Sequence, residues 1–288
     1  MVSRYCRFLC IAALALLLTV AATGCGSSQP AAQPLVKKID HVSISSPDPE
    51  GLFTTLTETL ELPVAWPLSS YQGFTTGAAN AGNVNIETIK FDTARPVLSA
   101  SIYGVVFESY PLSDTLDEFK QRGADPSDPQ DQMRDINGAQ VKVWTNVTLN
   151  ALCNDQYIVY LCEYAKEMED SLASRAVSRP FGGIGLVGGK EISIGTTEPQ
   201  QLREEWETIL APAVMSSDGV LSFDSGPAIH IVQASTDSII GLVLEVVSLD
   251  KARDFLSQKV MPGDTSEGEI HIDPMKVQGL DITLVEQP

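Results

Sequence analysis

Positive charge is scarce in this chain of 288 residues. Lys and Arg together number 19 against 37 Asp and Glu, so the formal net charge is −18 at pH 7. A surface of that sign repels the phosphates of nucleic acids and the headgroups of anionic lipids. We therefore expect no nucleic-acid partner, and solubility is the simplest explanation of the acidity.

Several catalytic motifs are also missing. The chain has no nucleophile elbow, dinucleotide fingerprint, zinc-protease helix or CxxC pair. The glycine-rich stretch 182–190 (GGIGLVGGK) leads into a predicted strand with no helix after it, so it does not fit a phosphate loop. These absences argue against hydrolases and nucleotide-dependent enzymes.

The N-terminus carries the most hydrophobic segment. Arg4 and Arg7 precede an apolar run from Phe8 to Ala22, which is shorter than the ~20 residues that a stable membrane span needs. Residues 1–24 are therefore predicted to be a signal peptide. Its end, AATGC, resembles the lipobox of bacterial lipoproteins, which implies that Cys25 becomes the lipidated first residue of the mature chain. An ordinary secretory signal is the alternative.

Residues 25–36 are mostly small, polar and proline-bearing, and are predicted to be a flexible tether. Removal of the signal peptide would leave 17 basic against 37 acidic residues, a net charge of −20. We expect a protein of the bacterial cell envelope, extracytoplasmic and held to the lipid bilayer through Cys25 alone.

Cysteine is almost absent from the part that follows. Only Cys153 and Cys162 remain beyond the predicted lipidation site. They could form a disulfide outside the cytoplasm, or stay as two buried free thiols. Neither has a histidine or basic neighbour in the sequence that would mark it as reactive.

The most informative feature that is present is a fourfold repeat, in which a short alternating strand precedes an amphipathic helix. The four units begin at Ile39, Ile102, Lys190 and Gly241. In the first, Val42 and Ile44 alternate with polar residues, and Asp48, Pro49 and Glu50 follow in the order typical of a helix start. Each unit continues into about three more strands, and a unit of this size cannot bury its sheet face alone.

The chain beyond the tether is long enough for two domains. A charged and then Pro- and Gly-bearing segment at 166–185 predicts a linker. It separates a first domain at 37–165 from a second at 186–288, with two repeats in each.

The opening IDHVSISSPDPEGLFTTLTETLELPV resembles the first module of the vicinal oxygen chelate superfamily, which includes glyoxalases, bleomycin-resistance proteins and extradiol dioxygenases. The resemblance extends from Val36 to the C-terminus. It implies an α+β fold of four βαβββ modules, paired into two curled-sheet, glyoxalase-like domains. In that family a metal is held by four side chains, typically His or Glu, from the first and last strands of both modules.

Carried over residue by residue, the resemblance implies one metal site in each half. The first would use His41, Glu87 and Glu163, with Gly104 in place of the fourth ligand. The second pocket would use Glu191, His230 and Glu286, with Gly241 in the same place, and it ranks lower because Glu286 lies near the chain terminus.

One imidazole and two carboxylates can hold one divalent metal such as Fe, Mn, Ni or Zn. No other cofactor is expected. Asp40 is not expected to assist His41, because neighbouring residues of a strand point to opposite faces.

Simpler explanations exist for each of these residues. A histidine on the polar face of a strand is more often a hydrogen-bonded pocket residue than a metal ligand. Glu87 and Glu163 sit within apolar strands, where an unpaired carboxylate is costly, so both need a partner. Gly104 and Gly241 are more simply strand kinks.

Other polar and aromatic side chains lie near these positions in the sequence. Glu108 and Glu245, four residues after the two glycines, could replace the lost ligand or be solvated at the rim. The aromatic residues Trp66, Tyr71, Phe74 and Tyr103 could line the first cavity or belong to the core.

Two functions of different classes follow. The favoured one is the binding of a small organic ligand in a cavity between paired modules, because both halves lack the same metal ligand. The alternative is a metal-dependent lyase, isomerase or dioxygenase in which the metal polarises vicinal oxygens of a substrate. The ligand, the oligomeric state and the pairing of the modules stay open.

Overall fold

The computed structural model describes residues 33–71, 73–92, 97–173, 180–261, 263–266 and 268–288. The predicted signal peptide, Cys25 and most of the predicted tether lie outside the described residues. Within those residues, no helix has the length and apolar character needed to cross a membrane.

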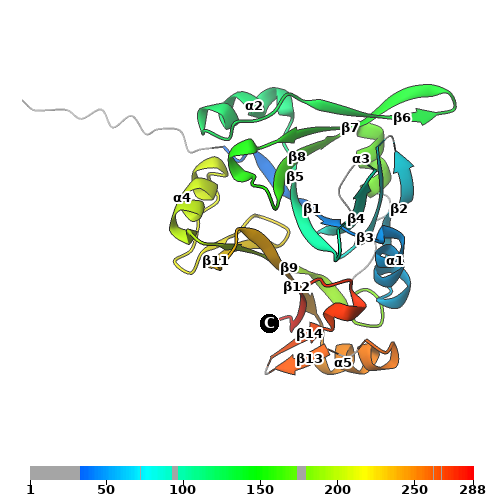
Figure 1. Ribbon diagram of the computed structural model, residues 1–288. Helices are drawn as coiled ribbons and strands as arrows, with labels where there is room; N and C mark the ends of the chain where they lie inside the picture. The colour runs from blue at the N-terminus through cyan, green and yellow to red at the C-terminus, as the bar shows by residue number, and fades with distance from the viewer. Residues whose placement is uncertain (1–32, 72, 93–96, 174–179, 262, 267) are drawn as a thin grey trace, which may run out of the picture. The chain divides into compact units, whose positions relative to one another are not determined.

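Two sheets contain the described strands (Figure 1). The first has eight strands in the order β2-β3-β4-β1-β5-β8-β7-β6, and the second has seven in the order β10-β11-β9-β12-β15-β14-β13. The strands of the first sheet are β1 (Val36–Ser45), β2 (Val64–Tyr71), β3 (Phe74–Asn80), β4 (Asn85–Phe91), β5 (Ser101–Ser109), β6 (Gln130–Ile136), β7 (Ala139–Thr148) and β8 (Ile158–Tyr164). Those of the second are β9 (Leu186–Thr196), β10 (Val220–Leu221), β11 (Ala228–Gln233), β12 (Ser238–Val246), β13 (Gly263–Ser266), β14 (Glu269–Ile272) and β15 (Ile282–Glu286).

The helices follow the first strand of each predicted unit, with one addition. They are α1 (Pro49–Thr54), α2 (Leu112–Gln121), α3 (Lys166–Ala173), α4 (Pro199–Ile209) and α5 (Leu249–Gln258). The additional helix α3 occupies part of the segment predicted to be a linker. A π-helical turn, Thr55–Thr59, continues α1.

The predicted α+β fold with curled sheets is confirmed. Three of the four units are a strand, a helix and three further strands, whereas the third, β9 to β11, has two strands after its helix. Consecutive units pair through their first strands, since β1 is antiparallel to β5 and β9 is antiparallel to β12. Each half is therefore a pair of neighbouring units in the sequence.

The start of α1 shows how the local sequence sets this arrangement. Asp48 caps the helix by accepting a hydrogen bond from the Gly51 N–H at 2.9 Å, and Pro49 occupies the first turn. Leu52, Leu56 and Leu60 follow at helical spacing and are all buried. The predicted helix start and the amphipathic character of this helix are confirmed.

The two glycines at the missing ligand positions lie beside irregularities of the ladder. In β5, the register with β1 shifts between Gly104 and Ile102, and in β12 the register with β9 shifts between Ile239 and Gly241. The interpretation of both glycines as strand kinks agrees with this geometry.

Candidate functional site

A cavity of about 270 Å³ lies against the first sheet and is largely aromatic. Its aromatic walls are Trp66, Tyr71, Phe74, Phe91, Tyr103, Trp144, Tyr160 and Tyr164. The four aromatic residues that the sequence suggested for this cavity are all among them. These rings come from β2, β3, β4, β5, β7 and β8, so the curvature of the sheet brings distant parts of the chain together.

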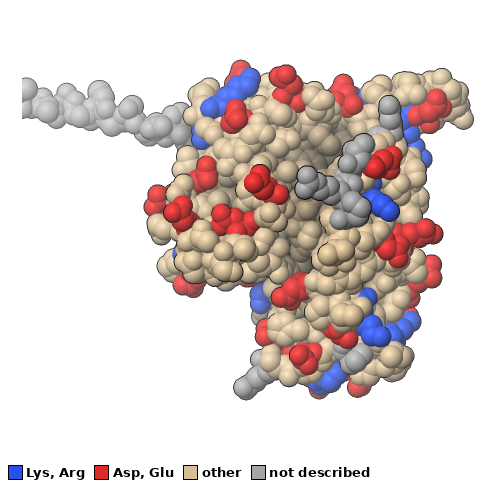
Figure 2. Space-filling model, viewed as in Figure 1, with Lys and Arg blue, Asp and Glu red and all other residues tan. Residues whose placement is uncertain are grey.

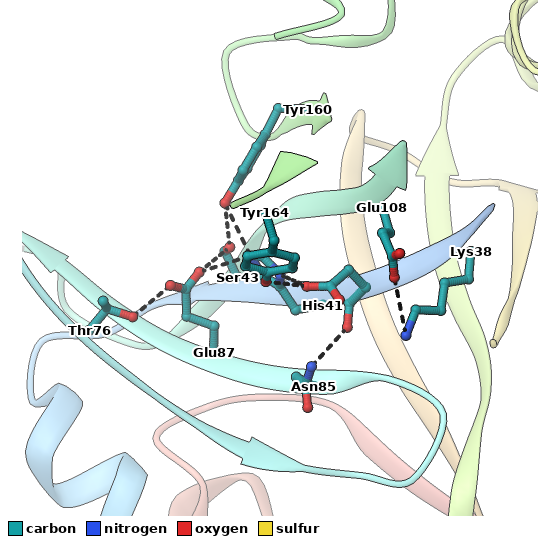
Figure 3. A network of polar contacts seen from close by, with 10 residues as sticks. Lys38, His41, Ser43, Thr76, Asn85, Glu87, Glu108, Tyr160 and Tyr164 are labelled. Atoms are coloured by element: carbon teal, nitrogen blue, oxygen red, sulfur yellow. Dashed lines mark hydrogen bonds and ion pairs between the residues drawn. The ribbon is translucent and has the colours of Figure 1, made fainter. Parts of the chain in front are cut away.

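The floor of the cavity holds two of the three predicted ligands of the first half. His41 of β1 and Glu87 of β4 are both buried, with Nε2 and Oε2 3.4 Å apart (Figure 3). Both oxygens of Glu87 also accept hydrogen bonds, Oε1 from Thr76 at 2.6 Å and Oε2 from Ser43 at 2.5 Å. Glu87 therefore has the partners that a buried carboxylate requires.

Asp40 also belongs to this network, although the sequence argument excluded it. Its Oδ2 lies 2.7 Å from Nδ1 of His41 and accepts a hydrogen bond from the Tyr164 hydroxyl at 2.8 Å. The ladder with β5 shifts register between Ile39 and His41, so β1 carries one extra residue there. Because of this bulge, Asp40 and His41 interact despite being neighbours, and the expectation of opposite faces is wrong.

Tyr160 of β8 closes the network from above. Its hydroxyl lies 3.1 Å from the Ser43 hydroxyl and 3.4 Å from Nε2 of His41 (Figure 3). A Cβ at Gly104 would lie 3.1 Å from the Cβ of Ser43, which is tight, and 3.5 Å from the Tyr160 ring, which is ordinary contact. Ser43 therefore packs closely against the position that would carry a ligand in the family pattern.

The charges of the floor depend on one another. Burial alone would lower the pKa of His41, but the Glu87 and Asp40 carboxylates outweigh it and raise that pKa to about 9. Burial alone would raise the pKa values of Asp40 and Glu87, and His41 instead lowers both, aided by the hydroxyl donors. At neutral pH the floor is therefore an imidazolium between two carboxylates.

The phenols stay neutral. Burial and the Glu87 charge raise the pKa of Tyr103, and both raise that of Tyr160 well above its ordinary value. Tyr160 therefore acts through its hydroxyl hydrogen bonds, and both rings supply apolar surface to the cavity.

Glu163, the third predicted ligand, does not join His41 and Glu87. Its carboxylate accepts a hydrogen bond from the backbone N–H of Leu112 at 3.0 Å, at the start of α2. Along β8 the cavity-lining residues are Ile158, Tyr160, Cys162 and Tyr164, so Glu163 lies on the alternate face. The predicted convergence of all three residues is wrong for this one.

The second half departs from expectation in the same way. Nδ1 of His230 lies 2.9 Å from Oε1 of Glu191, and Ser193 donates to that oxygen at 2.9 Å. Glu286 instead accepts from the backbone N–H of Leu249 at 2.9 Å, at the start of α5. Its role matches that of Glu163, so the last-strand glutamates of the second and fourth units each accept from the first helical N–H of their own unit.

The remaining candidates have other partners. Glu108 forms ion pairs with Lys37 at 2.8 Å and Lys38 at 3.4 Å. Cys153 and Cys162 are both free thiols, and Cys162 lines the cavity. Glu245 is half-buried in β12.

The sequence contained a signal for the residues that were missed. Val159 and Leu161 of β8 are buried apolar residues, so the alternate positions, Tyr160, Cys162 and Tyr164, had to face the other side. Asn146 could have been found by the same counting, since it lies between Trp144 and Thr148 at period two. Asp40 had no such signal, because a bulge cannot be read from alternation.

Comparison with known proteins identifies the fold. No known family profile matches this sequence, and neither does any curated protein sequence. Solved structures match well, and they define a fold of the glyoxalase and extradiol dioxygenase type. The predicted resemblance to the vicinal oxygen chelate superfamily is confirmed at the level of the fold.

Three of these structures are enzymes. A variant of 4-hydroxymandelate synthase from Streptomyces coelicolor has a TM-score of 0.58 at 10% identity, covering 88% of this chain and 93% of its own. The 2,3-dioxygenase LapB from Pseudomonas sp. KL28 has a TM-score of 0.58 at 12% identity, with coverages of 89% and 94%. The Mn(II)-bound glyoxalase from Novosphingobium aromaticivorans has a TM-score of 0.55 at 12% identity, with coverages of 88% and 83%.

The donor set of the cavity falls short of a metal site. Side chains that hold a divalent cation in this chemistry number at least three, and the cavity brings together one imidazole and one carboxylate whose oxygens already accept hydroxyl donors. Among the described residues, no group of three or more His, Cys, Asp or Glu has an arrangement that could hold a metal ion. No chemical step through a metal is derived for this chain.

Proposed function

We propose that this protein binds a small organic ligand in the aromatic cavity of the first sheet, outside the cytoplasm and on a lipid anchor. The observation that supports this most strongly is the pairing of eight aromatic walls with a buried polar floor in which the charged groups already have partners. A ligand can therefore bind without having to supply a partner for these buried charged groups.

The cavity suits a small molecule in size and character. Ligand sites are mostly apolar, with a few fixed polar groups that orient the ligand. Here the rings supply apolar surface, while Tyr160 presents a hydroxyl held by Ser43 and His41. The volume of about 270 Å³ lies just below the range of about 300–1,000 Å³ that is usual for such sites, so a compact ligand fits best.

Tryptophan fluorescence provides the test. Trp66 and Trp144 line the cavity, whereas the third tryptophan, Trp206, is buried in the second half. A panel of small aromatic and aliphatic compounds of different charge should contain compounds that alter the emission. The change should persist in Trp206→Phe.

A blocking variant completes this experiment. Thr148 lines the cavity, so Thr148→Phe should fill part of it and weaken binding, while thermal unfolding checks that the variant is folded. If no compound binds, or if binding is the same in Thr148→Phe, the proposal is refuted.

A metal-dependent lyase, isomerase or dioxygenase is the second candidate. One observation favours it: Asp40 holds Nδ1 of His41, which is how a carboxylate commonly orients a metal-binding histidine. Metal analysis of the protein after incubation with Fe, Mn, Ni or Zn tests it. Stoichiometric metal that is lost in His41→Ala and Glu87→Gln, but kept in Glu163→Gln, would establish this candidate over simple binding.

The anchor is supported by the sequence around Cys25. Its test is metabolic labelling with a fatty-acid analogue, in which wild-type protein should carry the label and Cys25→Ser should not. Equal labelling of the two proteins would contradict the anchor without affecting the cavity.

A further inference from the structure

We propose that the ligand of this cavity is a protonated organic amine with an aromatic or apolar body. This inference rests on the proposed binding function and adds the chemical class of the ligand. Three independent features of the cavity lead to it: the ring walls, the sign of the floor and one buried acceptor without a partner.

The walls form a cluster of rings in mutual contact. Tyr71 stacks on Phe74 with centroids 5.0 Å apart, and Trp144 meets Tyr71 edge-on at 5.8 Å. Tyr103 meets Phe91 edge-on at 5.8 Å on another part of the wall. Ring faces attract cations, and a cage of several rings is the usual means of holding an organic ammonium group.

The buried polar cluster at the floor has more negative than positive charge. Glu87 and His41 line the cavity, and Asp40 lies outside the lining, where it contacts His41 and adds a second carboxylate to the one cation. Among the described residues that line the cavity there is no Lys or Arg. The charge of Arg134 favours a lower pKa of the Tyr71 phenol, but Arg134 lies on the exposed strand β6 and does not line the cavity.

The surroundings have the same sign. Asp and Glu outnumber Lys and Arg by 37 to 19, and Figure 2 shows acidic side chains spread across the visible face. A field of this sign raises the local concentration of cations and repels anionic ligands.

Asn146 supplies the third feature. Asn146 lines the cavity, and its Oδ1 is buried without a hydrogen-bond partner among the described residues. A buried acceptor left without a donor costs roughly 1–3 kcal/mol, so such atoms usually mark a missing partner. An ammonium group has N–H donors to give to this oxygen and to the Tyr160 hydroxyl oxygen, while its charge is balanced by the floor.

These features disfavour the other ligand charges. A carboxylate or phosphate would meet a net negative floor and an acceptor oxygen. A neutral alcohol could donate to Asn146 and pack against the rings, but it lacks the positive charge that the floor and the ring faces attract. The amine uses all three.

Three probes of matched shape test the inference on the purified full-length protein: phenethylamine as the cation, 2-phenylethanol as the neutral compound and 3-phenylpropionate as the anion. Isothermal titration at pH 7 should give an affinity for the amine about tenfold or more above that for the alcohol. The anion should bind most weakly.

The variant Asn146→Asp should change the affinities of the charged probes in opposite directions. The new carboxylate should tighten the amine about tenfold, weaken the anion and leave the alcohol little changed. Asn150→Asp is the matched control, because Asn150 is exposed and outside the cavity lining. An equal gain in both variants would overturn the inference, since the effect would then be that of total charge.

The outcomes separate the inference from the proposed function. If the alcohol binds as tightly as the amine, and Thr148→Phe weakens both, the cavity binds ligands but the amine inference is wrong. If the amine does not bind at millimolar concentration, the inference is also wrong. The proposed function fails only if the wider panel finds no compound that requires the cavity.

Discussion

At the scale of single residues, His41 carries the most information about this protein. It is buried between Asp40 and Glu87, and its two ring nitrogens face one carboxylate each. Burial alone would raise the pKa of both carboxylates, and His41 is the leading cause that lowers them. The polar floor therefore behaves as one unit and not as three separate residues.

This coupling predicts how stability depends on pH. The pKa of His41 is about 6.5 in an unfolded chain and about 9 here, so its contribution is complete below pH 6.5 and is lost as the pH rises to 9. The free energy of unfolding should fall across that window by on the order of 3 kcal/mol more in wild type than in His41→Gln. Urea unfolding at pH 6, 7, 8 and 9 measures it, and parallel curves for the two proteins would contradict it.

The two carboxylates act at the acidic end. Their pKa values are lowered from 3.8 for Asp40 and 4.5 for Glu87, so their contribution is present above those values and is lost as the pH falls through the lowered ones. Asp40→Asn should therefore weaken the loss of stability in acid. The measurement is the urea midpoint between pH 5 and 3, and an unchanged slope would show that Asp40 is uncharged in the fold.

At the scale of the element, β8 explains most of what the sequence could and could not predict about the site. Its alternation is regular, and counting from Val159 and Leu161 places Tyr160 and Tyr164 at the cavity. The family pattern instead favoured Glu163, because a carboxylate in an apolar strand looked like a ligand. The alternation of β8 predicts the cavity residues correctly, whereas the carboxylate of Glu163 suggested a ligand that the structure does not place there.

The capping role of Glu163 leads to a prediction for α2. That helix begins after Pro111 without a side-chain cap of its own, and Glu163 provides the acceptor from β8. Glu163→Ala should lower the free energy of unfolding by about 1 kcal/mol, whereas Glu163→Gln should lose less, since its amide oxygen still accepts. Neither substitution should change ligand affinity in the cavity. A loss of binding in Glu163→Gln would show that Glu163 belongs to the binding site after all.

At the scale of the whole described chain, side chains of the first half bond directly to the backbone of the second. Asn83 donates to the Gly189 carbonyl at 2.8 Å and accepts from the Gly189 N–H at 2.6 Å. Phe107 of β5 packs against Trp206 and Phe223, with ring centroids 6.4 and 5.4 Å away. These contacts fall within one compact unit.

Asn83 is the clearest residue for testing this connection. Asn83→Ala would leave both groups of the buried Gly189 without partners, and we expect a loss of about 1–3 kcal/mol in stability. Asn83→Asp keeps the acceptor and should lose less. Urea unfolding followed by Trp206 emission measures both, and a wild-type midpoint in Asn83→Ala would show that the two halves do not depend on this bond.

The fold was predictable from the sequence because it repeats. Four strand-and-helix openings, with caps such as Asp48, specify units that must pair, and the structure shows neighbours pairing through β1 and β5 and through β9 and β12. Which units pair could not be read in advance, because each opening has the same pattern. The shorter third unit was not predicted, and helix α3 was missed because the segment 166–185 is charged and then Pro- and Gly-bearing, as a linker is.

The bulge in β1 limits how this chain can be altered. Asp40 is the extra residue in the ladder between Ile39 and His41, and the whole polar floor depends on that extra position. Deleting one residue there would straighten the strand and separate aspartate from imidazole, however faithfully every other side chain were kept. Transplanting this pocket into another scaffold therefore means copying an irregular backbone first and the side chains second.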